Sequence, residues 1–272
     1  MNWRALLKDL TPPLLWRAAR SLRPGGMRFT GDYSAWAEAR AASTGYDSDA
    51  AVRRVADAAR KVKRGEAADE RDAVAFDEIQ YSLPVLAALC HAAARVQRRL
   101  RVLDFGGALG RNYRHYRSFT NGASAVEWSV VELPALAAIG SGEFENDELR
   151  FFTSIEDAAS RGRPDVVLLC SVLQYVEDSY RLIAQLLELK AGNVVVDRTP
   201  CSDLERDVLT VQRVPESIYR ASYPCRVFSR RRLTAAFQPR YRRAAAFREP
   251  SGPWEGTHVR FELDGFLFDL SA

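Results

Sequence analysis

Three glycines stand close together where the chain is expected to turn from a strand into a helix. They are Gly106, Gly107 and Gly110. Glycines at such a turn let the backbone approach a ligand closely, and the helix N-terminus adds free N–H groups with a partial positive charge. Glu132 ends the next expected strand, where a carboxylate can accept hydrogen bonds from two ribose hydroxyls. The turn and Glu132 together predict a site for a nucleoside cofactor.

The spacing of the turn excludes the dinucleotide fingerprint, which requires the pattern G-x-G-x-x-G. When the pattern starts at Gly106, Ala108 and Arg111 take the other two glycine positions. When it starts at Gly107, Leu109 takes the second glycine position. Neither register therefore offers the glycines that a pyrophosphate needs.

The pattern of S-adenosylmethionine sites has an acidic residue at the strand end and then glycines at alternate positions. Asp104, Gly106 and Gly110 match it, while Ala108 replaces the middle glycine and has Gly107 beside it. Asp104 suits the ammonium group of S-adenosylmethionine, directly or through water. The segment therefore predicts this cofactor. The alternative is that the glycines only form a tight structural turn and that Glu132 is a solvated strand end.

Further residues are expected to complete the cofactor site. Ser154 and Ile155 end a short third strand, where an adenine would be flanked, and Ser171 follows the fourth strand. In open α/β sheets, ligands bind outside the carboxyl ends of the strands. We therefore predict that these three residues lie on the same side of the sheet as the glycine turn. No metal ligands are predicted.

Candidate residues for an acceptor follow the fourth and fifth strands and a later loop. Asp197 and His258 are the candidate bases, since an oxygen or nitrogen nucleophile must lose a proton during methyl transfer. Tyr175, Arg198 and Tyr223 are the candidate substrate-binding residues. The structural alternatives are an ion pair between Asp197 and Arg198 that braces the strand end, and an ordinary surface position for His258.

Arginines gather late in the chain. Either they form a solvated face of a helix and a strand, or they cradle a phosphate or carboxylate of an anionic acceptor. They are Arg220, Arg226, Arg230, Arg231, Arg232, Arg240, Arg242 and Arg243.

From residue 101 onward, short β-rich runs alternate with helical patterns, which is typical of parallel βαβ units. The sequence predicts an α/β fold with five parallel strands and a terminal antiparallel hairpin, the strand count of a Rossmann-like class I methyltransferase sheet. The parallel strands are expected over 101–105, 126–132, 149–152, 165–170 and 193–197, and the hairpin over 241–247 and 265–270, with 265–270 at an edge.

The residues before the sheet are expected to form a helical extension. Ser48 and Ser82 are placed to cap two of its helices, and Arg71 with Asp72 is expected to pair the extension with the sheet or to act as a lid. We predict two units, an N-terminal helical extension or cap over 1–98 and a cofactor-binding Rossmann-like domain over 99–272.

Composition limits the classes of partner. The net charge of +4 permits an anionic substrate but is too small to indicate nucleic acid, which we do not expect as a partner. The four cysteines and three histidines show no disulfide or zinc spacing. No run approaches the roughly 18 apolar residues of a membrane span, so a cytoplasmic protein is expected. Residues 1–23, rich in Leu, Trp and Arg, either pack on the protein or a partner, or lie on the inner membrane face.

The sequence also resembles a family of class I S-adenosylmethionine-dependent methyltransferases that are largely uncharacterised and often encoded among bacterial surface-polysaccharide genes. The resemblance spans nearly the whole chain. It implies a methyl donor site and a polysaccharide-precursor or lipid-linked acceptor. Its motifs are Gly31-Asp32-Tyr33 with Trp36, Gly45-Tyr46-Asp47, Glu70-Arg71-Asp72 with Phe76-Asp77, Leu103-Asp104-Phe105-Gly106-Gly107, Leu173-Gln174-Tyr175, Asp197-Arg198-Thr199-Pro200 and Tyr223-Pro224-Cys225.

Three functions follow as hypotheses. The first is a methyltransferase that acts on a small molecule or a glycan, anionic or neutral. The second is a non-catalytic scaffold with this fold in a polysaccharide-assembly complex. The third is a nucleic-acid methyltransferase, for which the late arginines are the only support, since no Asn-Pro-Pro-Tyr type of base-binding motif occurs.

Overall fold

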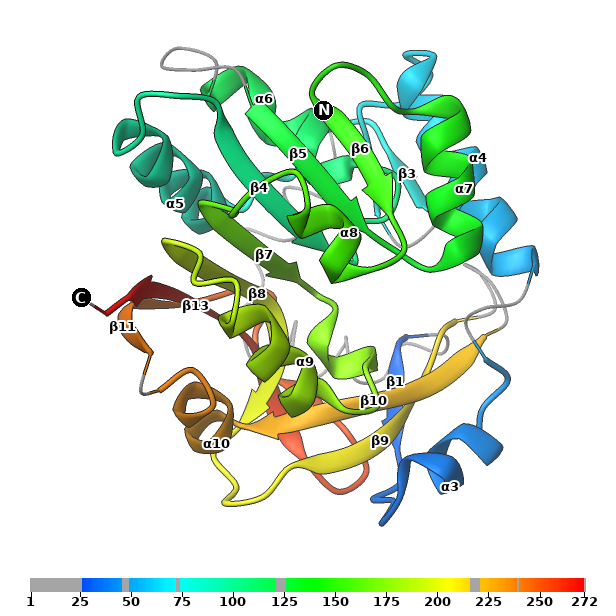
Figure 1. Ribbon diagram of the computed structural model, residues 1–272. Helices are drawn as coiled ribbons and strands as arrows, with labels where there is room; N and C mark the ends of the chain where they lie inside the picture. The colour runs from blue at the N-terminus through cyan, green and yellow to red at the C-terminus, as the bar shows by residue number, and fades with distance from the viewer. Residues whose placement is uncertain are drawn as a thin grey trace, which may run out of the picture.

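A mostly parallel sheet forms the centre of the molecule in the computed structural model (Figure 1). The structure describes residues 26–45, 49–71, 74–120, 126–215, 221–238 and 240–271. Five neighbouring strands run parallel in the order β6–β5–β4–β7–β8. Their bounds, in that order, are Leu149–Phe152, Val126–Val131, Leu100–Phe105, Val166–Cys170 and Asn193–Ser202. The predicted parallel Rossmann-like sheet is confirmed.

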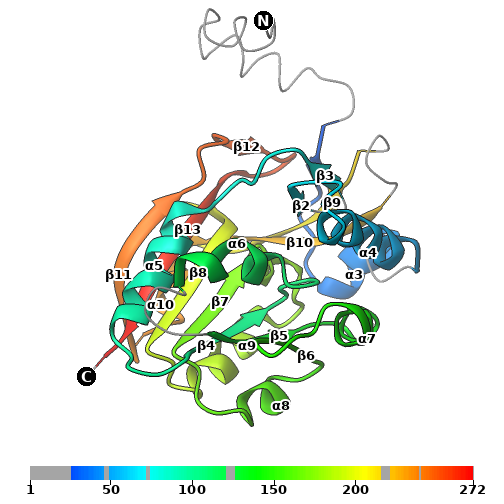
Figure 2. The same ribbon diagram turned by 90° about the horizontal axis from the view of Figure 1, so that it is seen from above.

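Helices cover both faces of this sheet, because its central strands are apolar on both sides (Figure 2). Val166–Cys170, for example, sends Val166 and Leu168 to one face and Val167 and Leu169 to the other. The first face packs against α4 (Asp49–Lys63), α5 (Leu83–Ala94), α6 (Arg111–Thr120) and α7 (Pro134–Glu143). The second face packs against α8 (Ile155–Ala159), α9 (Ser179–Leu187) and α10 (Arg230–Ala235).

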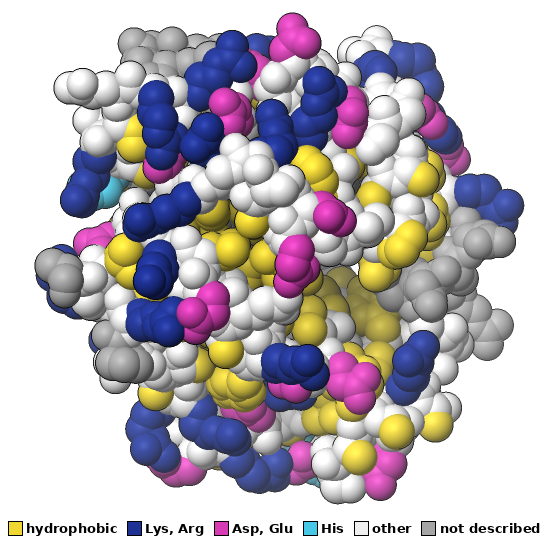
Figure 3. All heavy atoms as spheres, in the orientation of Figure 1, with side chains coloured by type: hydrophobic (Ala, Val, Ile, Leu, Met, Phe, Trp, Pro, Cys, Tyr) yellow, Lys and Arg dark blue, Asp and Glu magenta, His cyan; other side chains and the backbone are white. Residues whose placement is uncertain are grey.

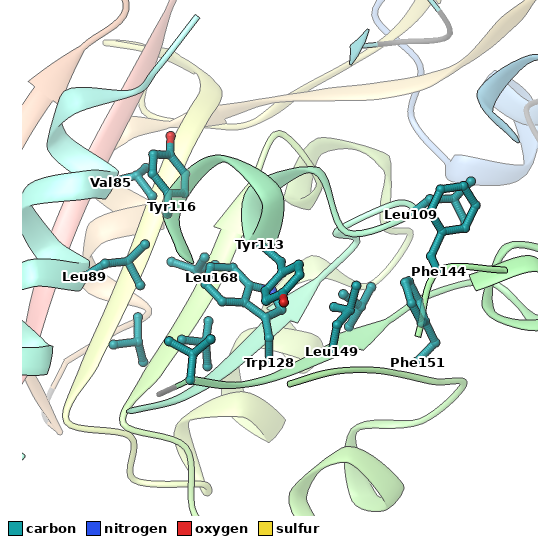
Figure 4. Packing of buried hydrophobic residues seen from close by; sticks show 14 of the residues in the cluster. Val85, Leu89, Leu109, Tyr113, Tyr116, Trp128, Phe144, Leu149, Phe151 and Leu168 are labelled. Carbon is teal, nitrogen blue, oxygen red and sulfur yellow. The ribbon is translucent and has the colours of Figure 1, made fainter. Parts of the chain in front are cut away.

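The core of the first face is centred on a fully buried tryptophan (Figure 4). Trp128 of β5 lies with its ring 6.0 Å from that of Tyr113 of α6, measured between centroids. Leu149 of β6 and Leu168 of β7 belong to the same cluster. Burial of this large side chain fixes α6 against β5, and α6 is the helix that begins at the glycine turn.

The far side of the sheet departs from the expected hairpin in one respect. β13 (Arg260–Leu270) pairs antiparallel with both β8 and β11 (Tyr241–Arg248). The prediction that residues 265–270 form an edge is therefore wrong. Phe266 and Phe268 explain the difference, since both side chains are buried in the second core cluster, as expected for a strand between two others. β12 (Trp254–Glu255) pairs with the start of β13.

A group of antiparallel strands continues the sheet beyond the carboxyl ends of the parallel strands (Figure 1). β9 (Val208–Arg213) pairs with β10 (Ser222–Ser229) on one side and with β1 (Arg28–Thr30) on the other. β10 joins the last residues of β8, which runs five residues past its predicted end at Asp197. The sequence analysis did not predict β1, β9 or β10. We call β1, β9 and β10 the cap sheet.

The N-terminal region contains strands as well as the expected helices. It includes α3 (Trp36–Ala41), α4, the hairpin of β2 (Asp69–Arg71) and β3 (Val74–Phe76), and α5. Ser82 occupies the N-cap position of α5, but its side chain makes no capping hydrogen bond to the helix. Ser48, Asp72 and the segment 1–23 lie outside the described residues. The division into 1–98 and 99–272 stays a prediction. Within the described part of the chain, no helix is long and apolar enough to cross a bilayer.

Candidate functional site

The glycine turn between β4 and α6 adopts a conformation that requires small residues. Gly106 and Gly110 have φ angles of 70° and 83°, and the N–H of Gly106 donates to the carbonyl of Val131 at 2.9 Å. A Cβ at Gly106 would collide with Cγ2 of Val172, and one at Gly107 would lie 2.5 Å from Oδ2 of Asp104. The backbone of this turn therefore packs directly against Val172 and Asp104, which only residues without a side chain allow at Gly106 and Gly107.

Ala108 takes the position at which the expected pattern has a glycine. Its φ is 48°, a left-handed conformation that is unusual for alanine. Its N–H donates to Oε1 of Glu132 at 3.1 Å. This bond joins the middle of the turn to the end of β5, so the two parts of the predicted cofactor site are in direct contact. The strain at alanine, of order 1 kcal/mol, is offset locally by that charge-assisted hydrogen bond.

Glu132 lies at the carboxyl end of β5 with its carboxylate against two backbone N–H groups. Besides Ala108, the N–H of Leu133 donates to Oε2 at 2.8 Å. Burial raises the pKa of Glu132, and the two backbone hydrogen bonds counter that effect. The next side chain, Leu133, is 47% exposed although it is a large apolar group. The sequence analysis did not single out Leu133. Its apolar character directly after Glu132 was the available signal.

Asp104 lies beneath the turn rather than beside an open surface. It is fully buried, and its carboxylate accepts hydrogen bonds of 3.2 Å from Nδ2 of Asn112 and Nε1 of Trp128. Burial raises its pKa to about 7, against the lowering effect of the two donors. These contacts connect Asp104 to the first turn of α6 and to β5, and thereby hold the glycine turn in shape.

The remaining predicted cofactor residues differ in their surroundings. The Oγ of Ser154 accepts from the N–H of Asp157 at 3.1 Å and caps α8, while the Ile155 side chain is buried in the second core cluster. Ser171 has a φ of 56°, donates its N–H to the carbonyl of Asp197 at 2.8 Å, and accepts from Nε2 of Gln174 at 3.0 Å. Their roles in binding a cofactor stay predictions.

A buried charge network beside α6 was not predicted from the sequence. Asp69 of β2 accepts from Arg111 Nη2 at 2.7 Å and lies 2.7 Å from Nε2 of His115. Burial would raise the pKa of Asp69, but the hydrogen bonds from His115 and Arg111 outweigh it and lower that pKa. Glu70 binds Arg114, and burial raises the pKa of Glu70 to about 7. The network fastens the β2–β3 hairpin to the first turns of α6.

This network joins the extension to α6 through Asp69 and Glu70. The expected role of Arg71 and Asp72, as a pair with the sheet or as a lid, stays a prediction because Asp72 lies outside the described residues. The Arg71 guanidinium lies 5.6 Å from the centre of the Phe76 ring. The hairpin therefore sits over the helix that begins at the glycine turn.

The candidate acceptor residues gather at the carboxyl ends of β7 and β8. Asp197 pairs in register with Cys170 and is buried. Burial raises its pKa, while the neighbouring Arg198 and Ser82 lower it in part. Ser82 precedes α5, so the start of this helix lies beside Asp197. The N–H of Ser82 donates to the Tyr116 hydroxyl at 3.0 Å. Asp197 and Arg198 form an ion pair with 3.6 Å between Oδ2 and Nε.

Tyr175 and Tyr223, predicted separately, are in contact. Their rings meet edge to face with centroids 5.1 Å apart. The Tyr175 hydroxyl donates to Oε1 of Gln212 at 3.0 Å, and Nε2 of Gln212 lies 3.4 Å from the Tyr223 hydroxyl. Gln212 also reaches Sδ of Met27 at 3.0 Å. Tyr175 belongs to a single 3₁₀ turn, η1 (Leu173–Tyr175), which packs on β8 and on β10 of the cap sheet.

The surface is hollowed between the ends of the parallel strands and the cap sheet. Figure 3 shows this hollow, with hydrophobic side chains on its floor. Tyr175 is 36% exposed and Leu133 is the exposed apolar side chain next to Glu132. The carboxyl edge of the sheet thus has a cofactor-type end at β4 and β5 and an aromatic end at β7 and the cap sheet.

His258 is not brought to this place by any described contact. It is exposed, lies between β12 and β13, and contributes to lowering the pKa of Asp32. The two predicted bases are therefore not a joined pair, because the β12–β13 turn carries His258 to the β1 side, where Thr257 donates its N–H to the Phe29 carbonyl at 2.9 Å.

The late arginines are mostly engaged with carboxylates. This supports the interpretation of a charged face over that of a single anion cradle. Arg220 lies outside the described residues, and Arg243 is exposed. The observed pairs are Arg226 with Asp207, Arg230 with Asp203, Glu262 and Asp264, Arg231 with Glu205, Arg232 with Asp207, Arg240 with Glu188, and Arg242 with Asp269. Among the described residues, no group of His, Cys, Asp and Glu side chains is arranged to hold a metal ion.

No family model matches the chain, and no curated protein matches it. Solved structures are similar to it in fold. The N-terminal domain of EvdMO1, crystallised with S-adenosylhomocysteine and D-fucose, is 15% identical over 78% of this chain and 94% of that chain, with a TM-score of 0.48. A Clostridium acetobutylicum S-adenosylmethionine-dependent methyltransferase is 11% identical over 72% and 94%, with a TM-score of 0.49. The Burkholderia thailandensis 1,6-didemethyltoxoflavin-N1-methyltransferase, bound to S-adenosylhomocysteine, is 17% identical over 82% and 89%, with a TM-score of 0.42.

Proposed function

We propose that the protein is an S-adenosylmethionine-dependent methyltransferase with a small-molecule acceptor. The observation that carries the proposal is the direct hydrogen bond between the glycine turn and Glu132, through the N–H of Ala108. This bond joins the Glu132 carboxylate, the proposed partner of the ribose hydroxyls, to the turn. In that turn a Cβ at Gly106 would collide with Val172, and a Cβ at Gly107 would collide with Asp104. Such a cradle fits a nucleoside whose sugar and amino-acid tail lie against the backbone.

Different residues would bind different parts of S-adenosylmethionine. Glu132 would accept from the ribose hydroxyls, Leu133 would offer an apolar surface to the base, and the turn at Gly106–Gly110 would hold the amino-acid end. Asp104 would act from below, by fixing the turn through Asn112 and Trp128. Bound there, S-adenosylmethionine would supply an electrophilic methyl group. The chain has then to position a nucleophile in line with that group.

Asp197 is the candidate base in this proposal. Burial raises its pKa towards the range in which a carboxylate accepts a proton effectively near neutral pH. His258 remains a candidate from the sequence, but its position beside Asp32 supports it less. Tyr175 and Tyr223 offer aromatic edges that suit a ring-shaped acceptor such as a sugar.

The resemblance supplies the finer parts of the proposal. The acceptor would belong to the polysaccharide-precursor or lipid-linked class, and would be met in the cytoplasm or at the inner face of the membrane. Residues 1–23 would then contact the membrane or a partner of the assembly complex.

Isothermal titration with S-adenosylhomocysteine tests the donor site. We expect Glu132→Ala to raise the Kd about 10- to 100-fold, since hydrogen bonds to a charged group contribute about 1.5–3 kcal/mol. Glu127→Ala is the matched control, because Glu127 lies on the same strand but binds Arg101. The 2′-deoxy analogue of S-adenosylhomocysteine should lose affinity for the wild type and respond less to Glu132→Ala. Unchanged binding by a folded Glu132→Ala protein would contradict the proposal.

Turnover distinguishes the enzyme from a scaffold. Release of S-adenosylhomocysteine in the presence of acceptor, lost in Asp197→Asn with donor binding intact, supports methyl transfer. Donor binding without turnover on any acceptor, together with a stable protein partner in pull-down, supports the scaffold instead.

A further inference from the structure

Arg198 stands where β8 leaves the parallel sheet and turns towards the cap sheet. The register between β7 and β8 ends at the pair of Cys170 and Asp197, so Arg198 is the first residue beyond it. Its φ is 49°, a left-handed value seldom adopted by a long side chain. The normal alternation of side chains along the strand is broken here, at the edge of the sheet where ligands of open α/β sheets bind.

Among the described residues, the guanidinium of Arg198 has fewer partners than similar arginines have. Four other arginines have side chains of comparable exposure, namely Arg111 (11%), Arg114 (22%), Arg226 (18%) and Arg230 (23%). Each of the four donates hydrogen bonds: Arg111 to Asp69, Arg114 to Glu70, Arg226 to the Glu177 carbonyl, and Arg230 to Asp264. The Arg198 side chain is 17% exposed, and its Nε is buried without a hydrogen-bond partner among the described residues.

Its ion pair with Asp197 does not satisfy it. The separation of 3.6 Å between Nε and Oδ2 is longer than a charge-assisted hydrogen bond. A buried N–H group without a hydrogen-bond acceptor lowers the stability of the folded protein, unless a bound ligand supplies the acceptor. Arginine presents its donors as a flat fork that matches the oxygens of a carboxylate or a phosphate.

The residues around Arg198 indicate which kind of ligand would accept its hydrogen bonds. η1, which carries Tyr175, packs on β8 and on the cap sheet, so the aromatic pair of Tyr175 and Tyr223 lies next to this strand. Most of the late arginines are already paired with carboxylates. Arg230 pairs with Asp264 of β13, Arg240 with Glu188, and Arg242 with Asp269 of β13.

We propose that Arg198 binds an oxyanion, a carboxylate or a phosphate, carried by the acceptor, and so orients the acceptor at the carboxyl ends of β7 and β8. This inference rests on the proposed function and names the class of acceptor more closely. Arg198 is then a recognition residue, and its fork sets the distance from the oxyanion to the nucleophile.

The test measures binding of three sugars of one ring type to protein saturated with S-adenosylhomocysteine. Glucuronate carries a carboxylate, glucose 6-phosphate carries a phosphate, and glucose is the neutral reference. Their Kd values are measured by ligand-observed NMR for the wild type, Arg198→Gln and Arg198→Lys. Arg226→Gln is the matched control, because Arg226 is equally buried but donates to a carbonyl within the protein.

The wild type should bind at least one of the charged sugars about tenfold or more tightly than glucose. Arg198→Gln should remove that difference, Arg198→Lys should keep part of it, and Arg226→Gln should keep all of it. A preference for glucuronate assigns the carboxylate, and one for glucose 6-phosphate assigns the phosphate. Equal binding of charged and neutral sugars by the wild type overturns the proposal, as does a charge preference that survives Arg198→Gln.

Two further measurements separate this inference from others. The affinity for S-adenosylhomocysteine should be unchanged in Arg198→Gln. A wild-type protein that does not bind S-adenosylhomocysteine would refute the proposed function and not the role of Arg198. Thermal unfolding without ligand decides against a merely structural role. Because Nε of Arg198 makes no hydrogen bond within the described residues, Arg198→Gln should leave the Tm equal or higher, whereas a bracing ion pair with Asp197 would make the Tm fall and overturn the proposal.

Discussion

The two halves of the sheet's carboxyl edge are built in different ways. The donor half that we propose consists of residues 104–110 and Glu132, which belong to one βαβ unit and touch through the Ala108–Glu132 hydrogen bond. The acceptor half that we propose consists of Tyr175, Asp197, Arg198, Gln212 and Tyr223, held together by β8, η1 and the cap sheet. The first half is local in sequence and the second is assembled from distant segments.

This difference teaches where function is specified. A cofactor shared by many proteins can be held by a short turn with fixed spacing, because backbone groups do much of the binding. An acceptor is recognised by side chains, and these are brought together only when distant strands pair. The two halves meet where Gly106 faces Val172, the residue between Ser171 and η1.

The largest effect should come from breaking the donor half at that junction. Gly106→Ala adds a Cβ against Cγ2 of Val172 at a φ of 70°. That Cβ would collide with Cγ2 and lie 2.9 Å from Cβ of Val172, so the turn or Val172 must shift. A displacement of about 1 Å is enough for a loss on the order of 100-fold. We expect that loss in the affinity for S-adenosylhomocysteine, measured by calorimetry.

Two variants sharpen this prediction. Gly65→Ala places the same methyl group at a φ of 75° with no atom within 4 Å, so it should leave donor binding unchanged. The double variant Gly106→Ala with Val172→Ala should recover part of the affinity, since the collision is removed. Binding by Gly106→Ala within about twofold of the wild type would show that the turn is not a close-packed cradle.

A smaller effect should appear in the pH dependence of stability. Burial raises the pKa of Asp104 to about 7 in the folded protein, above its value of about 4 when unfolded. Between these two values the folded state binds more protons, so the free energy of unfolding falls as the pH rises. Asp104→Asn should remove of order 2 kcal/mol of that decline between pH 4 and 8, measured by denaturant unfolding.

Glu70 provides the comparison for this measurement. Its pKa is also raised to about 7 by burial, so Glu70→Gln should flatten the profile in the same direction. Only Asp104→Asn should also weaken donor binding, because Glu70 acts on the β2–β3 hairpin. A pH profile of Asp104→Asn parallel to that of the wild type would mean that Asp104 does not titrate in this range.

The smallest effect should come from loosening the acceptor half. Gln212→Ala removes the group that accepts from Tyr175 and reaches Tyr223 and Met27. We expect the free energy of unfolding to fall by about 1–2 kcal/mol, as for a buried polar group that leaves partners unsatisfied. The affinity for S-adenosylhomocysteine should stay the same, with the exposed Gln185→Ala as the reference variant. A parallel loss of donor binding would show that the two halves are coupled.

Particular elements show how far the sequence was informative. The five parallel strands follow from runs such as Val166–Cys170, whose continuous apolar pattern only a strand buried on both faces produces. The predicted fifth strand ends at Asp197, and the residues that follow it include Pro200, a residue type that is disfavoured in central strands. In the structure β8 continues to Ser202, with Pro200 opposite Leu263 of β13.

The cap sheet shows the opposite case. β10 contains Pro224 and β1 is only three residues long, so neither has a strong local preference for a strand. β1 is stabilised by pairing with β9, nearly two hundred residues later, and by Phe29, whose ring packs 4.8 Å from that of Phe261. Such pairings depend on which edges are available after the main sheet has formed, which no local pattern contains.

The sequence by itself determined the parallel sheet, and it predicted the glycine turn and Glu132 that we propose as the donor half. Glycine spacing, the acidic strand ends and apolar periodicity act over a few residues, and local sterics convert them directly into structure. Only the tertiary structure decided that Tyr175 and Tyr223 touch, that His258 lies near Asp32, and that Nε of Arg198 has no hydrogen-bond partner among the described residues. The reason is that these facts depend on long-range strand pairing. β8 ends its pairing with β7 at Asp197, shifts its register against β13, and pairs with β10 from Cys201.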